Sequence, residues 1–242
     1  MRVLVISDVH SNLAALEAVL ADAGSWDIIW SLGDIVGYGP EPNECIARLS
    51  AEKHMAIAGN HDWAVLGKLD LEDFNHDARR AILWTREQLN PLSLAYLQAL
   101  PEALVEGDFT LAHGSPRSPI WEYLLSPGAA KVSFSYFHTL VCLVGHTHIP
   151  VRFRDHLPSN LCQVILPQEG ARILLGQERE IINPGGVGQP RDGDSRAAYL
   201  LLDSEQRTFE HRRVGYDIIE AQRKMRAAEL PKRLIVRLEG GW

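Results

Sequence analysis

Short apolar runs recur along the chain, and each of them ends in a polar group. The first, from Val3 to Ile6, has four aliphatic residues in succession without polar alternation. Such runs are typical of strands that are covered on both faces. Runs of a similar kind follow at residues 28–32, 55–58, 109–112 and 141–144. The pattern therefore predicts a set of buried strands.

Between the first three predicted strands, the sequence predicts two helices. Ser11 and Asn12 are suitable caps for a helix that ends near Gly24. Its apolar residues recur at three- and four-residue spacing: Leu13, Leu16, Val19 and Leu20. A second helix is expected at about residues 42–51. The alternation of strand and helix indicates a parallel sheet with helices packed on it.

The rest of the chain divides into a helical part and a strand-rich part. Residues 62 to about 100 are expected to be a helical insertion, interrupted at Asn90 and Pro91. Helices are also expected near 127–138 and at 216–229, the latter with Ile218, Ile219, Met225 and Ala228 facing inward. Short strands are expected at 103–106, 109–113, 141–145, 151–154, 163–166, 172–175, 180–182, 197–203 and 208–213. We expect these strands to form a second sheet.

The length and charge of the chain limit its expected domain number and its expected partners. A chain of 242 residues with 46% hydrophobic content can build one substantial core, so a single domain over residues 1–242 is expected. The 24 basic and 31 acidic residues give a net charge of −7, which argues against partners such as long nucleic acid or an anionic membrane. No apolar run has the length of a signal peptide or membrane span, so a cytoplasmic location is expected. The oligomeric state is left open.

The polar groups that follow the apolar runs are the candidate chemistry. They are Asp8 and His10, then Gly33-Asp34, Gly59-Asn60-His61-Asp62, His113-Gly114 and Gly145-His146-Thr147-His148. Side chains just past the carboxyl ends of parallel strands meet at one edge of a sheet. A single Asp-x-His pair is explained better by a helix cap than by a metal site. Its recurrence at the other strand ends favours a shared metal site.

These blocks, in this order, resemble the five motifs of the calcineurin-like metallophosphoesterase superfamily. The loop at residues 182–191 is similar to one in the small bacterial and archaeal members. The resemblance implies an α/β fold, a four-layer α-β-β-α sandwich of two mixed sheets flanked by helices. It also implies two divalent metal ions, of Mn, Fe, Zn or Co. Asp8, His10, Asp34 and His148 would hold the first ion, and Asp34, Asn60, His113 and His146 the second.

The chemistry of a two-metal centre requires ligands of the same types. Two cations about 3.5–4 Å apart need a bridging carboxylate, and their shared water loses its proton near neutral pH, which gives a hydroxide positioned to attack phosphorus. Mixed Asp, Asn and His ligands suit borderline cations rather than calcium. By resemblance, His61 would contact the leaving group and the phosphoryl charge. Asp62 beside it is the candidate for a supporting catalytic role.

Substrate contacts are suggested at two positions. Tyr38 lies beside the second motif, where it either stacks on a substrate base or packs against the site. Arg191 follows a glycine-rich loop whose free backbone amides could meet phosphate oxygens, although a surface role is equally open. The chain departs from protein phosphatases and enteric dinucleoside tetraphosphatases, because Gly33-Asp34 is not followed by their arginine. Gly186 stands where the family commonly has serine.

The expected function is hydrolysis of a phosphodiester or phosphomonoester in a small, nucleotide-like substrate, with attack by a hydroxide that bridges two metal ions. One alternative is a dinucleoside polyphosphate hydrolase. An alternative of another class is a metal-bound scaffold that has kept the fold without catalysis. Retention of His61, which is not expected to be a ligand, favours the enzyme.

Overall fold

Two six-stranded sheets lie face to face in the computed structural model, which describes residues 1–156 and 161–242. The order in the first sheet is β3 (His54–Ala56), β2 (Ile28–Ser31), β1 (Arg2–Ile6), β11 (Ala197–Asp203), β12 (Thr208–Val214) and β9 (Arg172–Leu174). The order in the second is β4 (Ala103–Glu106), β5 (Phe109–Ala112), β6 (Val141–Leu143), β10 (Glu180–Asn183), β7 (Val151–His156) and β8 (Leu161–Ile165). Both sheets mix parallel and antiparallel pairs.

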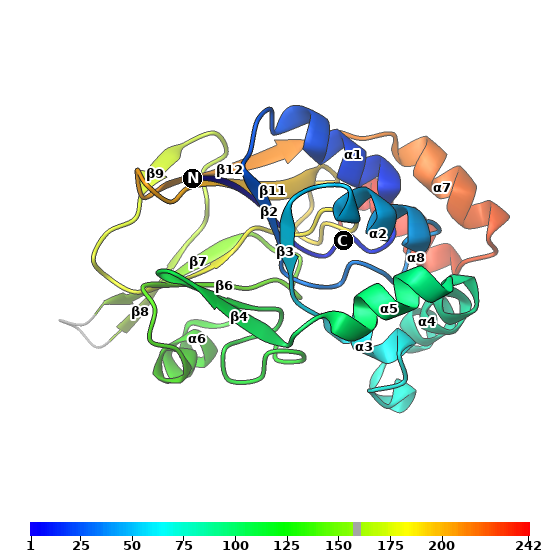
Figure 1. Ribbon diagram of the computed structural model, residues 1–242, viewed down its shortest axis with the longest axis horizontal. Coiled ribbons are helices and arrows are strands. Elements are labelled where there is room, and N and C mark those ends of the chain that lie inside the picture. The colour runs from blue at the N-terminus through cyan, green and yellow to red at the C-terminus, as the bar shows by residue number, and fades with distance from the viewer. Residues whose placement is uncertain (157–160) are drawn as a thin grey trace.

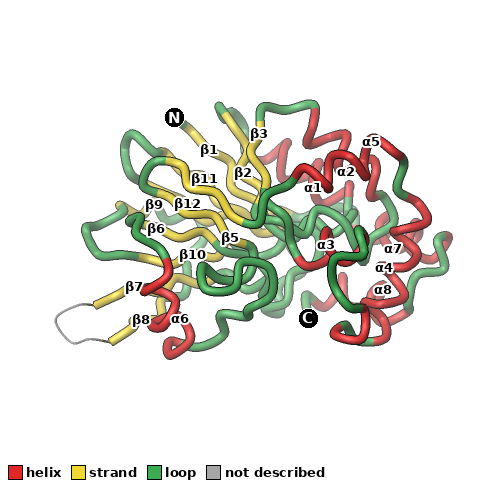
Figure 2. Tube along the Cα trace, turned by 60° about the horizontal axis from the view of Figure 1, so that its bottom comes forward, coloured by secondary structure: helices red, strands yellow, loops and turns green. Residues whose placement is uncertain are grey.

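Helices cover the outer face of each sheet (Figure 1). On the first sheet lie α1 (Leu13–Asp22), α2 (Pro42–Ser50), α7 (Ile218–Ala227) and α8 (Lys232–Gly240), joined by the helical block of α3 (Asn60–Val65), η1 (Leu71–Asp73), α4 (His76–Gln88) and α5 (Pro91–Ala99). On the second lie α6 (Pro127–Ser133) and η2 (Phe134–Tyr136). Figure 2 shows most helices on one side of the strands and α6 on another.

The buried apolar residues form three clusters, one for each boundary between layers. The first joins alternate residues of β1, such as Leu4, to the helices. The second lies between the sheets and includes Val5 from β1 and Leu143 from β6. The third joins the second sheet to Phe134. The expected four-layer α-β-β-α arrangement is therefore confirmed, and β1 is covered on both faces as its unbroken apolar run predicts.

Sequence reasoning placed the elements well but assigned three strands to the wrong sheet. The strands expected at 172–175, 197–203 and 208–213 are β9, β11 and β12, which belong to the first sheet. The reason is that β11 pairs antiparallel with β1, with Leu4 opposite Leu201. Such a long-range pairing leaves no mark on the periodicity of either strand. The expectation for Ile219 was also wrong, because its side chain is 76% exposed.

Local signals explain why the helical block has its observed bounds. The side chain of Asn75 accepts a hydrogen bond from the amide of Ala78 and so begins α4. Asn90 does the same for the amide of Ser93, with Pro91 in the first turn of α5. Proline cannot donate an amide hydrogen bond, so it suits a helix start and interrupts a longer helix. Within the described residues, no helix is both long and apolar enough to cross a membrane.

The glycine-rich loop after β10 docks on the loop after β1. The amides of Val187 and Gly188 donate to the carbonyl oxygens of Ser7 and Asp8, each at 2.9 Å. A β-carbon at Gly188 would overlap the carbonyl of Val9, which is backbone and cannot rotate away. The contact therefore requires glycine.

We expect Gly188→Ala to destabilise the protein by about 1–3 kcal/mol, because the added methyl group forces the two loops apart. Gly215→Ala is the matched control, since a β-carbon at that position meets no atom within 4 Å. Urea denaturation of both variants measures the difference. Equal stabilities would show that the loops relax at no cost.

Candidate metal centre

The predicted metal ligands lie where strands end, in loops or at a helix start. Asp8 and His10 follow β1, Asp34 follows β2, Asn60 begins α3, His113 follows β5, and His146 and His148 follow β6. Parallel pairing of β1 with β2 and of β5 with β6 brings these ends to the same side of their sheets. The expectation that these loops converge is met, because all seven side chains are buried close together.

The backbone at most of these residues is in the left-handed region. The φ angles are 55° at Asp8, 47° at His10, 53° at Asp34, 64° at His146 and 59° at His148. Side chains other than glycine seldom adopt this region, and such outliers concentrate at functional sites. Three of these loops also have a glycine immediately before the ligand, where chain segments cross closely.

One group of donor atoms surrounds the Nε2 atom of His10. The Nε2 atom of His148 lies 3.2 Å away, and Oδ1 of Asp8 and Oδ2 of Asp34 lie at 3.8 Å and 3.5 Å. Nε2 of His148 is in turn 3.3 Å from Oδ1 of Asp8. These four residues are the set predicted for the first ion.

A second group surrounds the Nε2 atom of His113. Nδ1 of His146 and Oδ1 of Asn60 each lie 3.2 Å from it, and Oδ2 of Asp34 lies at 3.3 Å. The same oxygen of Asp34 therefore belongs to both groups. Its other oxygen, Oδ1, accepts a hydrogen bond from the amide of His61 at 2.8 Å, which fixes the orientation of the carboxylate.

The tautomers required by the surroundings leave lone pairs facing one another. Nδ1 of His10 lies 3.2 Å from the carbonyl of Val36, and Nδ1 of His148 lies 2.5 Å from that of Gln189. A carbonyl only accepts, so each Nδ1 carries the proton and each neutral ring turns an unprotonated Nε2 toward the other. Two such atoms at 3.2 Å cannot hydrogen-bond. A cation between them would satisfy both.

Charges within the centre are strongly coupled. Burial lowers the pKa of His10, His146 and His148 below the ordinary value, so these rings are neutral. Burial would also lower the pKa of His113, but the Asp34 carboxylate outweighs it and raises that pKa to about 9. Without a metal, a proton on His113 therefore balances Asp34. Metal binding at this group would release that proton.

The donor set fits a borderline divalent cation in each group. Imidazole nitrogens with carboxylate and amide oxygens suit zinc, iron, manganese or cobalt. Oδ1 of Asp8 is buried and has no hydrogen-bond partner, as expected for an atom that faces a cation site. Burial raises the pKa of Asp8 to about 6, a cost that a neighbouring cation would remove.

His61 and Asp62 lie beside the centre in different surroundings. The ring of His61 lies edge-on to that of His10, with centroids 4.9 Å apart, and its Nδ1 has no partner. Burial lowers the pKa of His61 to about 4. Asp62 instead accepts hydrogen bonds from the amides of Gly59 at 2.9 Å and Val36 at 3.1 Å. Asp62 thus connects the loop after Asp34 with the start of α3.

The candidate substrate residues Tyr38 and Arg191 lie against the centre and against each other. The ring of Tyr38 is buried, 4.5 Å from that of His10 and 4.3 Å from that of His61 between centroids. The guanidinium of Arg191 lies 5.7 Å from the Tyr38 ring. Tyr38 therefore packs on two site histidines, whereas the partly exposed Arg191 lies at the edge.

The expectation of free amides in the glycine-rich loop was wrong at three positions. The amide of Gly185 donates to Oδ1 of Asn183 at 2.8 Å, and those of Val187 and Gly188 donate to the loop after β1. They hold the fold and are not available to a phosphate. At Gly186 a β-carbon would lie 3.1 Å from the His148 ring. Glycine, in place of the serine common in the family, therefore leaves the His148 ring more room.

Sequence reasoning missed two residues that border the centre. The ring of Tyr123 stacks on that of His146 at 3.7 Å between centroids and is 46% exposed. Arg237, from α8, shares a hydrogen-bond acceptor with Arg191. Neither belongs to a strand–loop motif, and no local pattern marks either one. Both reach the centre only through tertiary packing.

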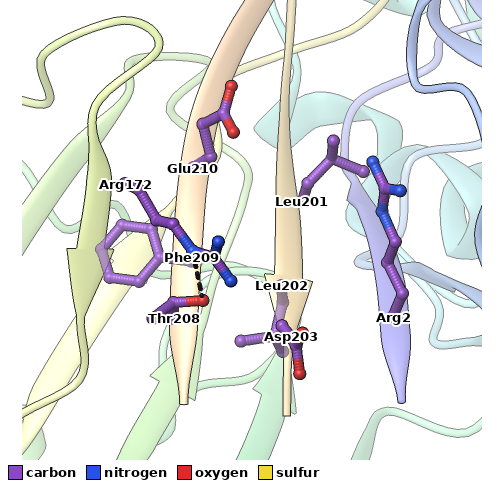
Figure 3. A pocket seen from close by; sticks show the side chains of 8 residues that line it. All are labelled: Arg2, Arg172, Leu201, Leu202, Asp203, Thr208, Phe209 and Glu210. Atoms are coloured by element: carbon purple, nitrogen blue, oxygen red, sulfur yellow. Dashed lines mark hydrogen bonds between the residues drawn. The ribbon is translucent and has the colours of Figure 1, made fainter. Parts of the chain in front are cut away.

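A surface pocket of about 250 Å³ lies elsewhere and includes none of the predicted site residues (Figure 3). Arg2, at the start of β1, lines it, whereas the metal donors follow the other end of that strand. Its polar groups are already engaged: Arg172 donates to the hydroxyl of Thr208 at 3.1 Å, and Asp203 accepts from two amides of the following turn. This pocket does not resemble a catalytic site.

Comparison with known proteins agrees with the geometry. The domain profile described as the calcineurin-like phosphoesterase superfamily domain matches residues 1–207. The uncharacterized protein MJ0912 of Methanocaldococcus jannaschii is 42% identical over 243 residues, which cover 98% of this chain and 96% of that protein.

Two solved structures have the same fold along the whole chain. The crystal structure of a metallophosphoesterase from Sphaerobacter thermophilus is 49% identical, with a TM-score of 0.91, and the match covers 100% of this chain and 99% of that one. The hypothetical protein PH1004 from Pyrococcus horikoshii OT3 is 20% identical, with a TM-score of 0.78 and coverage of 100% and 98%. The second likeness shows the fold alone. The profile match and the relatives show that this chain belongs to the calcineurin-like phosphoesterase superfamily.

Proposed function

We propose that the chain hydrolyses a phosphoester bond in a small, nucleotide-like substrate with the help of two divalent metal ions. Membership of the family supports a phosphoester hydrolase. The observation that carries the two-ion proposal is the single oxygen of Asp34 that lies 3.5 Å from Nε2 of His10 and 3.3 Å from Nε2 of His113. One carboxylate oxygen shared by two groups of donor atoms is the arrangement that a bridged pair of cations requires.

The ions, when bound, would polarise the phosphoryl group and supply a water acidic enough to act as a nucleophile near pH 7. The protein's part is to hold the donors and orient them. The carbonyls of Val36, Leu32 and Gln189 fix the tautomers of His10, His113 and His148. Such contacts behind the ligands also make the ligating nitrogen more basic. Manganese, iron, zinc and cobalt all suit this donor set.

We assign His61 to the leaving group and to the developing phosphoryl charge. Its ring is held between Tyr38 and Phe74, with centroids 4.3 Å and 5.5 Å away, so the side chain is fixed before substrate arrives. By distance alone it could instead be a ligand, because its ring nitrogen, a His10 nitrogen and an Asp34 oxygen lie within 4.8 Å of one another. Asp62 positions the α3 start that carries His61.

A metal-bound scaffold without catalysis is the competing proposal from another class. We expect the metal-loaded chain to hydrolyse bis(4-nitrophenyl) phosphate with added manganese, measured as nitrophenol release. The same protein treated with a chelator is the control. Absence of turnover on this and on a series of natural phosphate esters, with both metals present by elemental analysis, would favour the scaffold.

Replacing Asp34 by Asn should disrupt metal binding more broadly than any other single change, because a neutral amide bridges two cations poorly. Elemental analysis should find about two metal equivalents in the wild type and well under one in the variant. Asp108→Asn is the control, since its side chain is 64% exposed and pairs with Arg207 rather than with a proposed ligand. A full metal complement in Asp34→Asn would refute the bridging role.

His61→Ala should keep both metals and lower the rate by roughly 10²–10⁴-fold, the usual contribution of a positioned acid or hydrogen-bond donor. If His61 protonates the leaving group, alkyl esters should lose more activity than nitrophenyl esters. The control is His76→Ala, whose side chain is 80% exposed. Equal losses on both ester series would assign His61 an electrostatic role, and loss of one metal would make it a ligand.

A further inference from the structure

Two arginines from distant parts of the chain meet at one glutamine beside the metal centre. Nη2 of Arg191 and Nη1 of Arg237 both donate to Oε1 of Gln189, each at 2.9 Å. The two nitrogens are therefore no more than twice that distance apart. Arg237 belongs to α8, which lies beyond residue 207, where the family match ends.

Neither guanidinium is neutralised by a side-chain carboxylate. Across the described residues, no Asp or Glu oxygen lies within 4.0 Å of Arg191 or Arg237, whereas the nearby Arg196 and Arg213 both pair with aspartates. Nε of Arg191 is buried and has no partner at all. Nε of Arg237 donates to the main-chain oxygen of Trp242 at 2.6 Å. Even if that oxygen belonged to a charged chain terminus, the pair would keep a net positive charge.

Placing two such cations together is unfavourable unless an anion joins them. Burial, and then the charge of Arg191, lower the pKa of Arg237 to about 10. Both side chains are only partly buried, so a ligand in solution can reach them. Paired guanidinium groups bind phosphate through parallel N–H donors, and they do so more strongly than neutral donors.

The arginine pair lies beside the metal donors without contacting their carboxylates. Arg191 lies over the ring of Tyr38, and the same ring packs on His10 and His61. Within the described residues, the carboxylates of Asp8 and Asp34 pair only with histidines, not with either arginine. The two guanidinium groups are therefore placed next to the donor groups, where a second phosphate linked to the reacting one would lie.

We propose that Arg191, Arg237 and Gln189 form an anion clamp for a second phosphate of the substrate, so that the preferred substrate carries at least two linked phosphate groups. This proposal rests on the proposed function for its substrate class. It favours nucleoside or dinucleoside polyphosphates over simple phosphodiesters. The C-terminal helix α8 then takes part in specificity through Arg237.

Gly241, just after α8, holds this helix in place against the loop that carries Arg191. The amide of Gly193 donates to the carbonyl of Gly241 at 2.8 Å, and Gly241 adopts a φ of 63°. A β-carbon at Gly241 would overlap the backbone of Asp194. The two halves of the clamp are thus fixed relative to each other before any ligand binds.

Calorimetric titration of the full, metal-free chain with inorganic tripolyphosphate tests the clamp without any need for turnover. The wild type should bind tripolyphosphate more tightly than orthophosphate, and Arg237→Gln should weaken binding by about 10-fold or more, as loss of a charge-assisted contact implies. Lys232→Gln removes a charge from the same helix at an exposed position and should change binding less than about twofold.

Gln189→Glu is the second variant, for the case that Arg237→Gln fails to fold. A carboxylate at this position supplies the missing anion from within the chain, so it should raise the unfolding temperature and abolish tripolyphosphate binding. Unchanged binding in a folded Arg237→Gln or Gln189→Glu protein would overturn the clamp, as would failure of the wild type to bind tripolyphosphate.

Kinetics distinguish failure of the clamp from failure of the proposed function. In the manganese-loaded enzyme, Arg237→Gln should raise the Michaelis constant for a dinucleoside polyphosphate by about 10-fold while changing bis(4-nitrophenyl) phosphate little, because only the longer anion extends from the metal ions to the arginines. Equal effects on both substrates would overturn the clamp. If the wild type hydrolyses no ester, the proposed function fails, and the titration still decides whether the clamp exists.

Discussion

The rest of the structure depends on one buried carboxylate, that of Asp34, and on the two histidine nitrogens, of His10 and His113, that face it. The side chains of Asp34, His10 and His113 are at most 1% exposed, and water cannot solvate their facing atoms. Buried polar groups without partners are costly. The fold tolerates this set only because a proton on His113 offsets part of the cost and a cation in each group would offset more. The site is therefore organised for cations throughout.

Holding these donors together imposes strain that the two sheets must support. Five ligand residues have positive φ angles, each costing of order 1–3 kcal/mol. The surrounding packing compensates, because β1 is buried on both faces and its end is anchored by amides from the loop after β10. A rigid group of donor atoms of this kind suits catalysis on phosphate esters generally. It does not by itself choose among them.

We propose that selection of substrate depends instead on elements outside the shared motifs. Tyr123 stacks on His146 from the segment between β5 and α6, and Arg237 approaches from the last helix. Neither position contributes a metal donor, so either can vary without loss of the metal chemistry. The same separation explains why the family supports a reaction class for this chain, whereas the substrate has to be argued from individual side chains.

The sequence alone determined the strands and the helix caps, and it named the seven side chains that the structure brings together, because each signal depends on neighbours in the chain. An apolar run followed by Gly-Asp or Gly-Asn-His carries its own signal, as does Asn90 before Pro91. Only the tertiary structure decided that β9, β11 and β12 join the first sheet and that Arg237 meets Arg191. Strand pairing and packing of a terminal helix depend on contacts between residues far apart in sequence. No local pattern records such contacts, since the same side chains would look alike in either sheet.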